Sequence, residues 1–283
     1  MTSSAQNVRR SFGSFQARYL LYIPLVFMSV FYLLPLYIML ITGLKSFEEV
    51  SLVTMWDLPR TLGFDNFIEA YNKLSPHLWN SFNMVIPAAV ISSFLGSING
   101  FVLAKWKFRG ANIIFPLLLF GMFIQYQSIL IPLVQFMRSI HMYGGLPGLM
   151  LAHIIYGIPI TTLTFRNYYA SLPKEFVEAA RMDGAGLLGT YYHILLPLSL
   201  PSFVVVLIWQ FTSAWNDFLF AVVLTGNINW PITVALNNMA GSQIIEWNVQ
   251  MAGSFLAALP TLLVYIFLVR YFLRGLMAGS LKG

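Results

Sequence analysis

The chain has 283 residues, of which 58% are hydrophobic and only 9% are charged. Soluble domains carry about 25% charged residues, so the composition excludes an ordinary water-soluble protein. The absence of cysteine excludes disulfides, thiolate nucleophiles and cysteine-ligated metal sites. A net charge of +6 is typical of a membrane protein whose loops on one side are basic.

Six apolar stretches follow one another along the chain, each long enough to cross a bilayer as a helix. They cover about 19–44, 78–104, 111–137, 146–165, 197–224 and 251–270. These runs lack the period-two alternation of a barrel strand, and only helices and closed barrels satisfy the backbone in lipid. The sequence therefore predicts an all-α, polytopic membrane protein with six transmembrane helices.

The distribution of basic residues predicts the orientation of these helices. With both termini in the cytoplasm, the cytoplasmic segments hold twelve basic residues: Arg9, Arg10, Arg18, Lys105, Lys107, Arg109, Arg166, Lys174, Arg181, Arg270, Arg274 and Lys282. The external loops then hold four, namely Lys45, Arg60, Lys73 and Arg138. This is the asymmetry that the positive-inside rule requires. We expect a cytoplasmic segment at 1–18, a transmembrane domain at 19–274 that includes a cytoplasmic loop at 166–196, and a cytoplasmic tail at 275–283.

The cytoplasmic loop contains a short helical pattern between Pro173 and Gly184. Proline suits the first turn of a helix, and glycine suits its end. Phe176, Val177 and Ala180 fall on one face at helical spacing, so this face is expected to pack against another surface. An ordinary amphipathic helix lying against the membrane explains the same pattern.

A longer spaced motif in this loop resembles a known family. Its residues are Glu178, Ala179, Ala180, Asp183, Gly184, Ala185, Ile194, Leu196 and Pro197. They are similar to the "EAA" loop of ABC importer permeases, which couples the membrane helices to a separate ATPase subunit. Trp215 to Phe218 and the closing segment from Arg274 to Gly283 resemble the maltose-type carbohydrate permeases. Phe165 to Tyr169, Trp209 to Phe220 and Thr233 to Asn238 most resemble permeases for glucose or mannose.

This resemblance implies a type I importer permease fold and a set of partners. They are a second homologous permease subunit, two ATPase subunits, an extracytoplasmic sugar-binding protein, the sugar and the lipid of a prokaryotic inner membrane. No phosphate-binding loop of the Gly-x-x-x-x-Gly-Lys-Ser/Thr type occurs in the sequence, so ATP and Mg²⁺ are expected on the ATPase subunits and no cofactor on this chain. The permease itself is expected to be non-catalytic.

Candidate solute-path residues lie within the predicted helices. They are Asn83, Gln125, Tyr126, Gln127, Trp215, Asn216 and Asp217. Apart from Arg270 at the end of the last stretch, Asp217 is the only Asp, Glu, Lys or Arg inside the six apolar stretches, and ionisable residues within a span are functional candidates. Gln125 to Gln127 lie between Pro116 and Pro132, where a broken helix exposes backbone groups.

Each of these candidates has a structural alternative. A polar residue in a span can bond a neighbouring helix, and the small polar residues of 78–104 can serve close helix packing. The outer loop from Thr225 to Gln250 resembles one that reaches into the sugar-binding protein, but a solvated connector would also be polar. The four histidines, His77, His141, His153 and His193, show no metal-ligand spacing.

The sequence thus favours a transport subunit powered by another chain. An ion-coupled secondary transporter is the alternative, but such proteins usually place several ionisable groups in their spans. An intramembrane enzyme would need a metal motif or paired carboxylates, which the spans lack.

Overall fold

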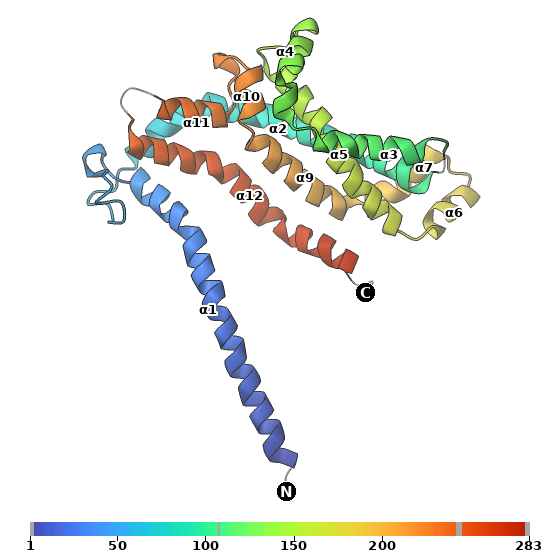
Figure 1. Ribbon diagram of the computed structural model, residues 1–283, viewed down its shortest axis with the longest axis horizontal. Helices are drawn as coiled ribbons and strands as arrows, with labels where there is room; N and C mark the ends of the chain where they lie inside the picture. The colour runs from blue at the N-terminus through green and yellow to red at the C-terminus, as the bar shows by residue number, and fades with distance from the viewer. Residues whose placement is uncertain (1–2, 107, 242–244, 281–283) are drawn as a thin grey trace. The chain divides into compact units, whose positions relative to one another are not determined.

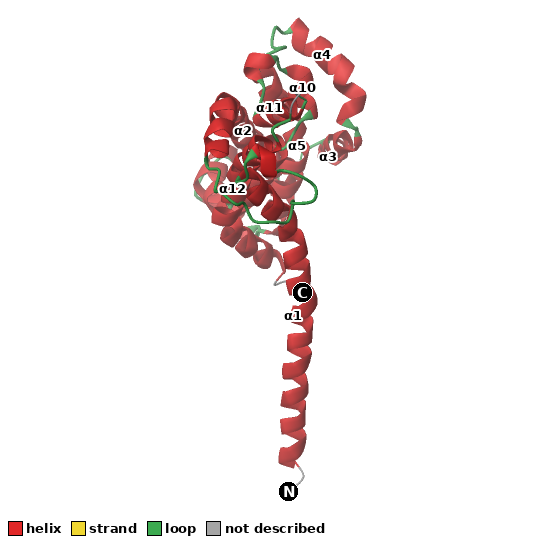
Figure 2. Cartoon of the chain, turned by 90° about the vertical axis from the view of Figure 1, so that its left-hand side faces the viewer, coloured by secondary structure: helices red, strands yellow, loops and turns green. Residues whose placement is uncertain are grey.

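A computed structural model describes residues 3–106, 108–241 and 245–280. The described residues form helices joined by loops, with no β-strand among them (Figure 2). The chain divides into two compact units. The first comprises residues 1–71 and 243–256, and the second comprises 72–242 and 257–283.

The first unit contains the whole of α1 and the beginnings of two further helices. Helix α1 runs from Ser3 to Gly43 and is followed by the short helix η1, Phe47–Glu49. The unit also holds the first turns of α2, Asp65–Lys105, and of α12, Trp247–Ser280. Phe67 of α2 and Phe255 of α12 meet edge to face at 6.1 Å.

The second unit contains the remaining helices and the main core (Figure 1). They are α3 (Ala111–Phe120), η2 (Gly121–Phe123), η3 (Tyr126–Ile129), α4 (Leu130–Ser139), α5 (Leu146–Ser171), α6 (Glu175–Met182), α7 (Leu187–Thr190), η4 (Tyr191–Leu195), α8 (Leu196–Leu198), α9 (Leu200–Trp215), α10 (Leu219–Leu224), η5 (Asn227–Asn229) and α11 (Ile232–Ala240). One buried apolar cluster is built around Trp215 and Phe220, and another around Phe101 and Phe165.

Within the described residues, four helices are long and apolar enough to cross a membrane. Their span segments are Tyr22–Gly43, Asp65–Lys105, Leu146–Ser171 and Trp247–Val269. Two bent helix pairs, 111–139 and 187–215, also pass the test, which brings the candidate spans to as many as six. The all-α architecture predicted from the sequence is thus confirmed, with as many as six helices that can cross a membrane among the described residues.

Two of the expected helices are broken rather than continuous. The pair at 111–139 bends by 91° around Ile124 and Gln125, whose backbone is extended. The pair at 187–215 bends by 77° at Ser199, directly before Leu200 and Pro201. Proline lacks an N–H donor and clashes with the preceding turn, which explains this bend. The expected helix 197–224 ends at Trp215, and α10 begins only at Leu219.

Other helices exceed their expected bounds. Helix α2 begins at Asp65 instead of 78, α5 continues to Ser171 instead of 165, and α12 continues to Ser280. Helix α1 includes most of the expected N-terminal segment 1–18, whose first two residues lie outside the described ones. The last three residues of the expected tail 275–283 also lie outside them.

Helices α2 and α5 approach each other closely where α2 carries Gly96 and Gly100. A Cβ atom on Gly96 would collide with Thr161 of α5. On Gly100 it would lie 2.7 Å from the backbone nitrogen of Arg166. Glycines four residues apart let two membrane helices bring their backbones together, and packing of this kind replaces the hydrophobic effect within lipid.

We predict that Gly100→Ala destabilises the protein because the new methyl group meets backbone atoms that cannot rotate away. Overpacking of this kind costs about 1–3 kcal/mol. Thermal unfolding of the detergent-purified protein measures the loss. Gly121→Ala is the matched control, because Gly121 has a helical backbone and nothing within 4 Å of the added atom. Equal melting temperatures for the two variants would contradict the close packing.

Candidate functional site

The EAA loop forms a short helix, α6, that is packed on one side and open on the other. Val177 and Ala180 are buried, and Val177 belongs to the cluster that contains Phe101, Phe165 and Tyr191. The guanidinium of Arg181 lies over the Trp106 ring at 5.0 Å, just beyond the end of α2. The loop is therefore fixed to the helices that precede and follow it.

Gly184 ends α6 as the motif predicts. Its φ of 80° lies in the left-handed region, which favours glycine. The Ala185 N–H donates to the Ala180 carbonyl at 2.9 Å, and the Gly184 N–H donates to the Arg181 carbonyl at 3.0 Å. This pair of bonds is the Schellman motif, which satisfies carbonyls left open at a helix end. The presence of glycine at position 184 of the motif thus has a structural reason.

The opposite face of α6 is exposed and partly apolar. Glu178, Ala179 and Asp183 are exposed, and Met182 is 88% exposed. Phe176, expected on the packed face, is 43% exposed because it lies at the edge of the stripe formed by Val177 and Ala180. An exposed apolar stripe on a rigid helix is suited to docking on another protein.

A chain of buried hydroxyl groups connects the end of the loop to α2 and α5. The Tyr191 hydroxyl donates to Ser97 Oγ at 3.0 Å. Ser97 Oγ is hydrogen-bonded to the Tyr169 hydroxyl at 2.7 Å, and that hydroxyl donates to Ser199 Oγ at 3.0 Å. Ser199 then donates to the Leu196 carbonyl at 2.9 Å. Each hydroxyl in the chain can thus donate one hydrogen bond to the next group along it. The hydrogen bonds of such a chain strengthen one another in a low dielectric.

Sequence reasoning missed this hydroxyl chain. Its only signal is the run of serines in α2, for which the sequence suggests close helix packing. Ser92, Ser93 and Ser97 are completely buried. Ser92 accepts a hydrogen bond from Gln210 Nε2 at 3.0 Å. These serines therefore serve the packing of helices in this conformation.

The remaining motif residues lie in the same part of the fold. Ala185 begins the turn after α6, Ile194 lies in the π-helical turn Tyr191–Leu195, and Leu196 and Pro197 are the first two residues of α8. Leu196 packs against the cluster around Tyr191. Helix α6 lies beyond the end of α5 and beside α7 (Figure 1). The residues of the predicted coupling motif thus lie together on one continuous segment.

The second candidate site lies where two helices are interrupted. Gln125, Tyr126 and Gln127 lie at the break after α3 and are exposed. Asn216, also exposed, and Asp217 lie at the break between α9 and α10. The two breaks meet because the Tyr126 ring packs on Phe220 of α10 at 5.0 Å. Tyr156 of α5 contacts the same Phe220 ring at 5.1 Å.

Asp217 has a clear structural role. Its Oδ2 atom accepts a hydrogen bond from the Ala221 N–H at 3.1 Å, in the first turn of α10. The same oxygen is 3.5 Å from Nε2 of His153 on α5. His153 Nε2 is buried and has no hydrogen-bond partner in the described part of the chain. Sequence spacing gave no sign of this partner, because His153 lies on a different helix.

Trp215 and Asn83 stand apart from this group. Trp215 is 2% exposed, its ring stacks on Phe211 at 5.4 Å, and its Nε1 donates to the Ala257 carbonyl at 3.0 Å. In this conformation its ring therefore has no free face for a sugar. Asn83 is exposed on α2. No hydrogen bond or ring contact among the described residues joins it to the helix breaks.

The segment from Thr225 to Gln250, predicted to be an outer loop, contacts α2. The Asn80 amide donates to the carbonyls of Ile228 and Trp230, and Ser81 Oγ accepts from the Ile232 N–H at 2.8 Å. Asn237 and Asn238 on α11 are exposed. Part of this loop, 242–244, lies outside the described residues.

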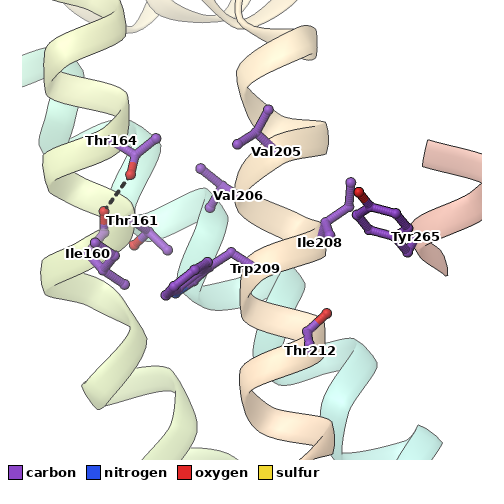
Figure 3. Close-up of a pocket in the computed structure, with 9 residues that line it drawn as sticks. All are labelled: Ile160, Thr161, Thr164, Val205, Val206, Ile208, Trp209, Thr212 and Tyr265. Carbon is purple, nitrogen blue, oxygen red and sulfur yellow. Dashed lines mark hydrogen bonds between the residues drawn. The ribbon is translucent and has the colours of Figure 1, made fainter. Parts of the chain in front are cut away.

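A cavity of about 390 Å³ lies between α5, α9 and α12 (Figure 3). Its lining includes Val205, Val206, Ile208, Trp209 and Tyr265. The Thr164 hydroxyl, also in the lining, donates to the Ile160 carbonyl at 2.9 Å. The cavity contains none of the predicted solute-path residues, and its mainly apolar walls are a poor match for a polyhydroxylated ligand.

Comparison with known proteins agrees with this architecture. Residues 93–277 match the family described as binding-protein-dependent transport system inner membrane component. A probable ABC transporter permease of Pyrococcus horikoshii is 47% identical over 94% of this chain and 98% of its own. A xylose/arabinose import permease of Haloferax volcanii is 36% identical over 90% of both chains. A glucose import system permease of Saccharolobus solfataricus is 33% identical over 93% of this chain and 95% of its own.

A solved structure shares the fold. It belongs to a bacterial ABC transporter that imports the acidic polysaccharide alginate. The match covers 91% of this chain and 98% of that one, with a TM-score of 0.76 and 22% identity. Permeases of this kind are non-catalytic membrane subunits that work with ATPase subunits and a binding protein. The chain therefore belongs to the family of binding-protein-dependent transport system inner membrane components, the multi-pass permeases of ABC importers.

Proposed function

We propose that the chain carries a sugar, a monosaccharide such as glucose or mannose, into the cytoplasm of a prokaryotic cell by alternating access. The observation that carries this proposal is helix α6, which offers an exposed face while its other face is fixed to the spans. Relatives named for xylose, arabinose and glucose support a monosaccharide. In this proposal both termini and the EAA loop are cytoplasmic, as the distribution of basic residues favours.

The exposed face of α6 docks in this scheme into a groove of the ATPase subunit. Movement of that subunit is transmitted as a rigid-body movement, because the hydroxyl chain from Tyr191 to Ser199 connects the loop to α2 and α5. The chain forms the path together with a second, homologous permease. ATP and Mg²⁺ are bound by the two ATPase subunits, and this chain binds no cofactor.

The solute passes the two helix breaks in this scheme. Gln125, Gln127 and Asn216 offer exposed amides, and Tyr126 offers an aromatic ring. Breaks in membrane helices also leave backbone groups unbonded within a span, where they can replace water around a polar solute. Asn83 and Asp217 complete the proposed path, with Trp215 supporting it from behind.

The energy source provides the first test. We expect uptake of labelled glucose or mannose into vesicles that contain the whole transporter and its binding protein to stop when ATP is depleted, even with ion gradients maintained. A panel of pentoses, hexoses and oligosaccharides then ranks the substrates. Uptake that continues without ATP would refute the ATP-driven mechanism, and preference for oligosaccharides would refute the monosaccharide assignment alone.

Gly184→Val tests the coupling helix. A β-branched residue at a φ of 80° costs about 1–2 kcal/mol and disturbs the end of α6. We expect weaker co-purification of the ATPase subunits and at least tenfold slower uptake, with normal membrane insertion. Gly186→Ser is the matched control, because Gly186 has an extended backbone before α7 where serine caps well. Normal uptake by Gly184→Val would remove the coupling role from this turn.

Asp217 distinguishes the proposed mechanism from ion coupling. Asparagine retains an oxygen that can accept from the Ala221 N–H, whereas alanine leaves this buried N–H without its acceptor, at a cost of about 1–3 kcal/mol. We expect Asp217→Asn to keep uptake within about twofold and Asp217→Ala to lower both uptake and thermal stability. Complete loss of uptake in a stable Asp217→Asn protein would instead indicate that the charge itself is required.

A further inference from the structure

The segment Val50–Leu58, here called the wedge, exposes apolar side chains after the end of α1. Leu52 and Val53 are 87% and 90% exposed, and Trp56 and Leu58 are also exposed. Single exposed apolar residues are ordinary, but four within nine residues form a patch that indicates a contact surface.

Two hydrogen bonds fix the position of the wedge along the axis of α1. Lys45 Nζ donates to the Thr54 carbonyl at 2.6 Å, and the Tyr37 hydroxyl donates to the Trp56 carbonyl at 3.2 Å. Tyr37 lies six residues before Gly43, the end of the candidate span, which places it about 9 Å inside that end at 1.5 Å per residue. The chain therefore leaves the span and folds back along it.

Several backbone carbonyls in and next to the wedge are paired within the protein, whereas the side chains of Ser51 and Asp57 are exposed. The Thr54 hydroxyl donates to the Glu49 carbonyl at 2.6 Å, and the Asp57 N–H donates to the Thr54 carbonyl at 3.0 Å. With the bonds from Tyr37 and Lys45, three carbonyls of this region have donors within the protein. Irregular backbone at membrane depth requires such internal partners.

A hollow of about 360 Å³ lies beneath the wedge, between the ends of two spans. Ile38 and Thr42 line it from α1, and Trp247 and Met251 line it from α12. Val50, Leu52 and Met55 of the wedge close the other side, together with the polar residues Lys45 and Ser51. Trp247 is the first residue of its candidate span, and tryptophan at such a position favours the membrane interface.

We propose that the wedge inserts into the boundary between headgroups and acyl chains, and that the hollow beneath it holds an acyl chain of a membrane phospholipid. A soluble protein is the other class of partner for an exposed apolar patch. The bond between Tyr37 and Trp56 favours lipid, because it holds the wedge alongside the span, below the level that a protein in water reaches. Amphipathic surface segments bury their apolar side about 5–10 Å into this boundary.

The absence of cysteine allows a direct measurement of depth. Val53→Cys, carrying a nitroxide label, is placed in the complete transporter and reconstituted into phospholipid vesicles. We expect oxygen, which partitions into lipid, to relax the label several-fold more than a water-soluble nickel chelate does. Arg60→Cys is the matched control from the same loop, and the order should be reversed there, because Arg60 is an exposed charged position.

Two results would overturn the membrane location. One is that the ratio of relaxation by oxygen to relaxation by the nickel chelate is the same for the labels at positions 53 and 60. The other is protection of the Val53 label only when the sugar-loaded binding protein is added, which would assign the patch to that protein.

The occupant of the hollow is tested with a phospholipid that carries a photoreactive group in its acyl chain. We expect crosslinks on the peptides that contain Met55 and Met251. The Met251→Trp substitution fills the hollow and should lower these crosslinks at least threefold, while crosslinks to the exposed α1 residues Phe27 and Phe31 stay unchanged. Thermal unfolding confirms that the variant is folded. An equal decrease at all positions, or none at Met55, would refute a lipid in the hollow.

Discussion

The close contact of α2 and α5 is the constraint on which the coupling region depends. Gly96 and Gly100 allow the two backbones to meet, and Ser97 between them lies within reach of Tyr169 on α5. Without this approach the hydroxyl chain from Tyr191 to Ser199 could not form. The loop that carries α6 would then lose this hydrogen-bonded connection to α2 and α5. In lipid, where apolar burial gives helices little preference for one another, such contacts decide the arrangement.

The sequence predicted the helical membrane architecture and the end of α6 because both depend on local properties. Long apolar runs require helices in lipid, and Gly184 marks a left-handed turn by its identity alone. The bend at Ser199 was within reach of the same reasoning, since Pro197 and Pro201 flank it. It was missed because continuous hydrophobicity through 197–224 outweighed the prolines. Similarly, α2 extends beyond its apolar run because polar residues can continue a helix outside the hydrocarbon core.

Contacts between distant parts of the chain could not be predicted in this way. Nothing near Asp217 in the sequence points to His153, and Trp215, conspicuous as a sugar-stacking candidate, is enclosed by Phe82 and Phe211. The hydroxyl chain likewise joins residues from four segments. Each of these depends on the packing of helices, which a single sequence does not specify. In contrast, Gln125 to Gln127 were selected because prolines flank them, and the helix is indeed interrupted there.

Because the helix pair bends at Ser199, α9 can tilt about that end as one rigid rod. This helix has 16 residues, so it is about 24 Å long at 1.5 Å per residue. Its beginning is next to Ser199 in the hydroxyl chain, and its end is next to the helix break that contains Asn216 and Asp217. A tilt of about 10° at the fixed end moves the far end of such a rod by about 4 Å. A displacement of that size is comparable to the donor–acceptor distance of a hydrogen bond. A small rotation near α6 is therefore enough to make or break contacts at the interrupted helices.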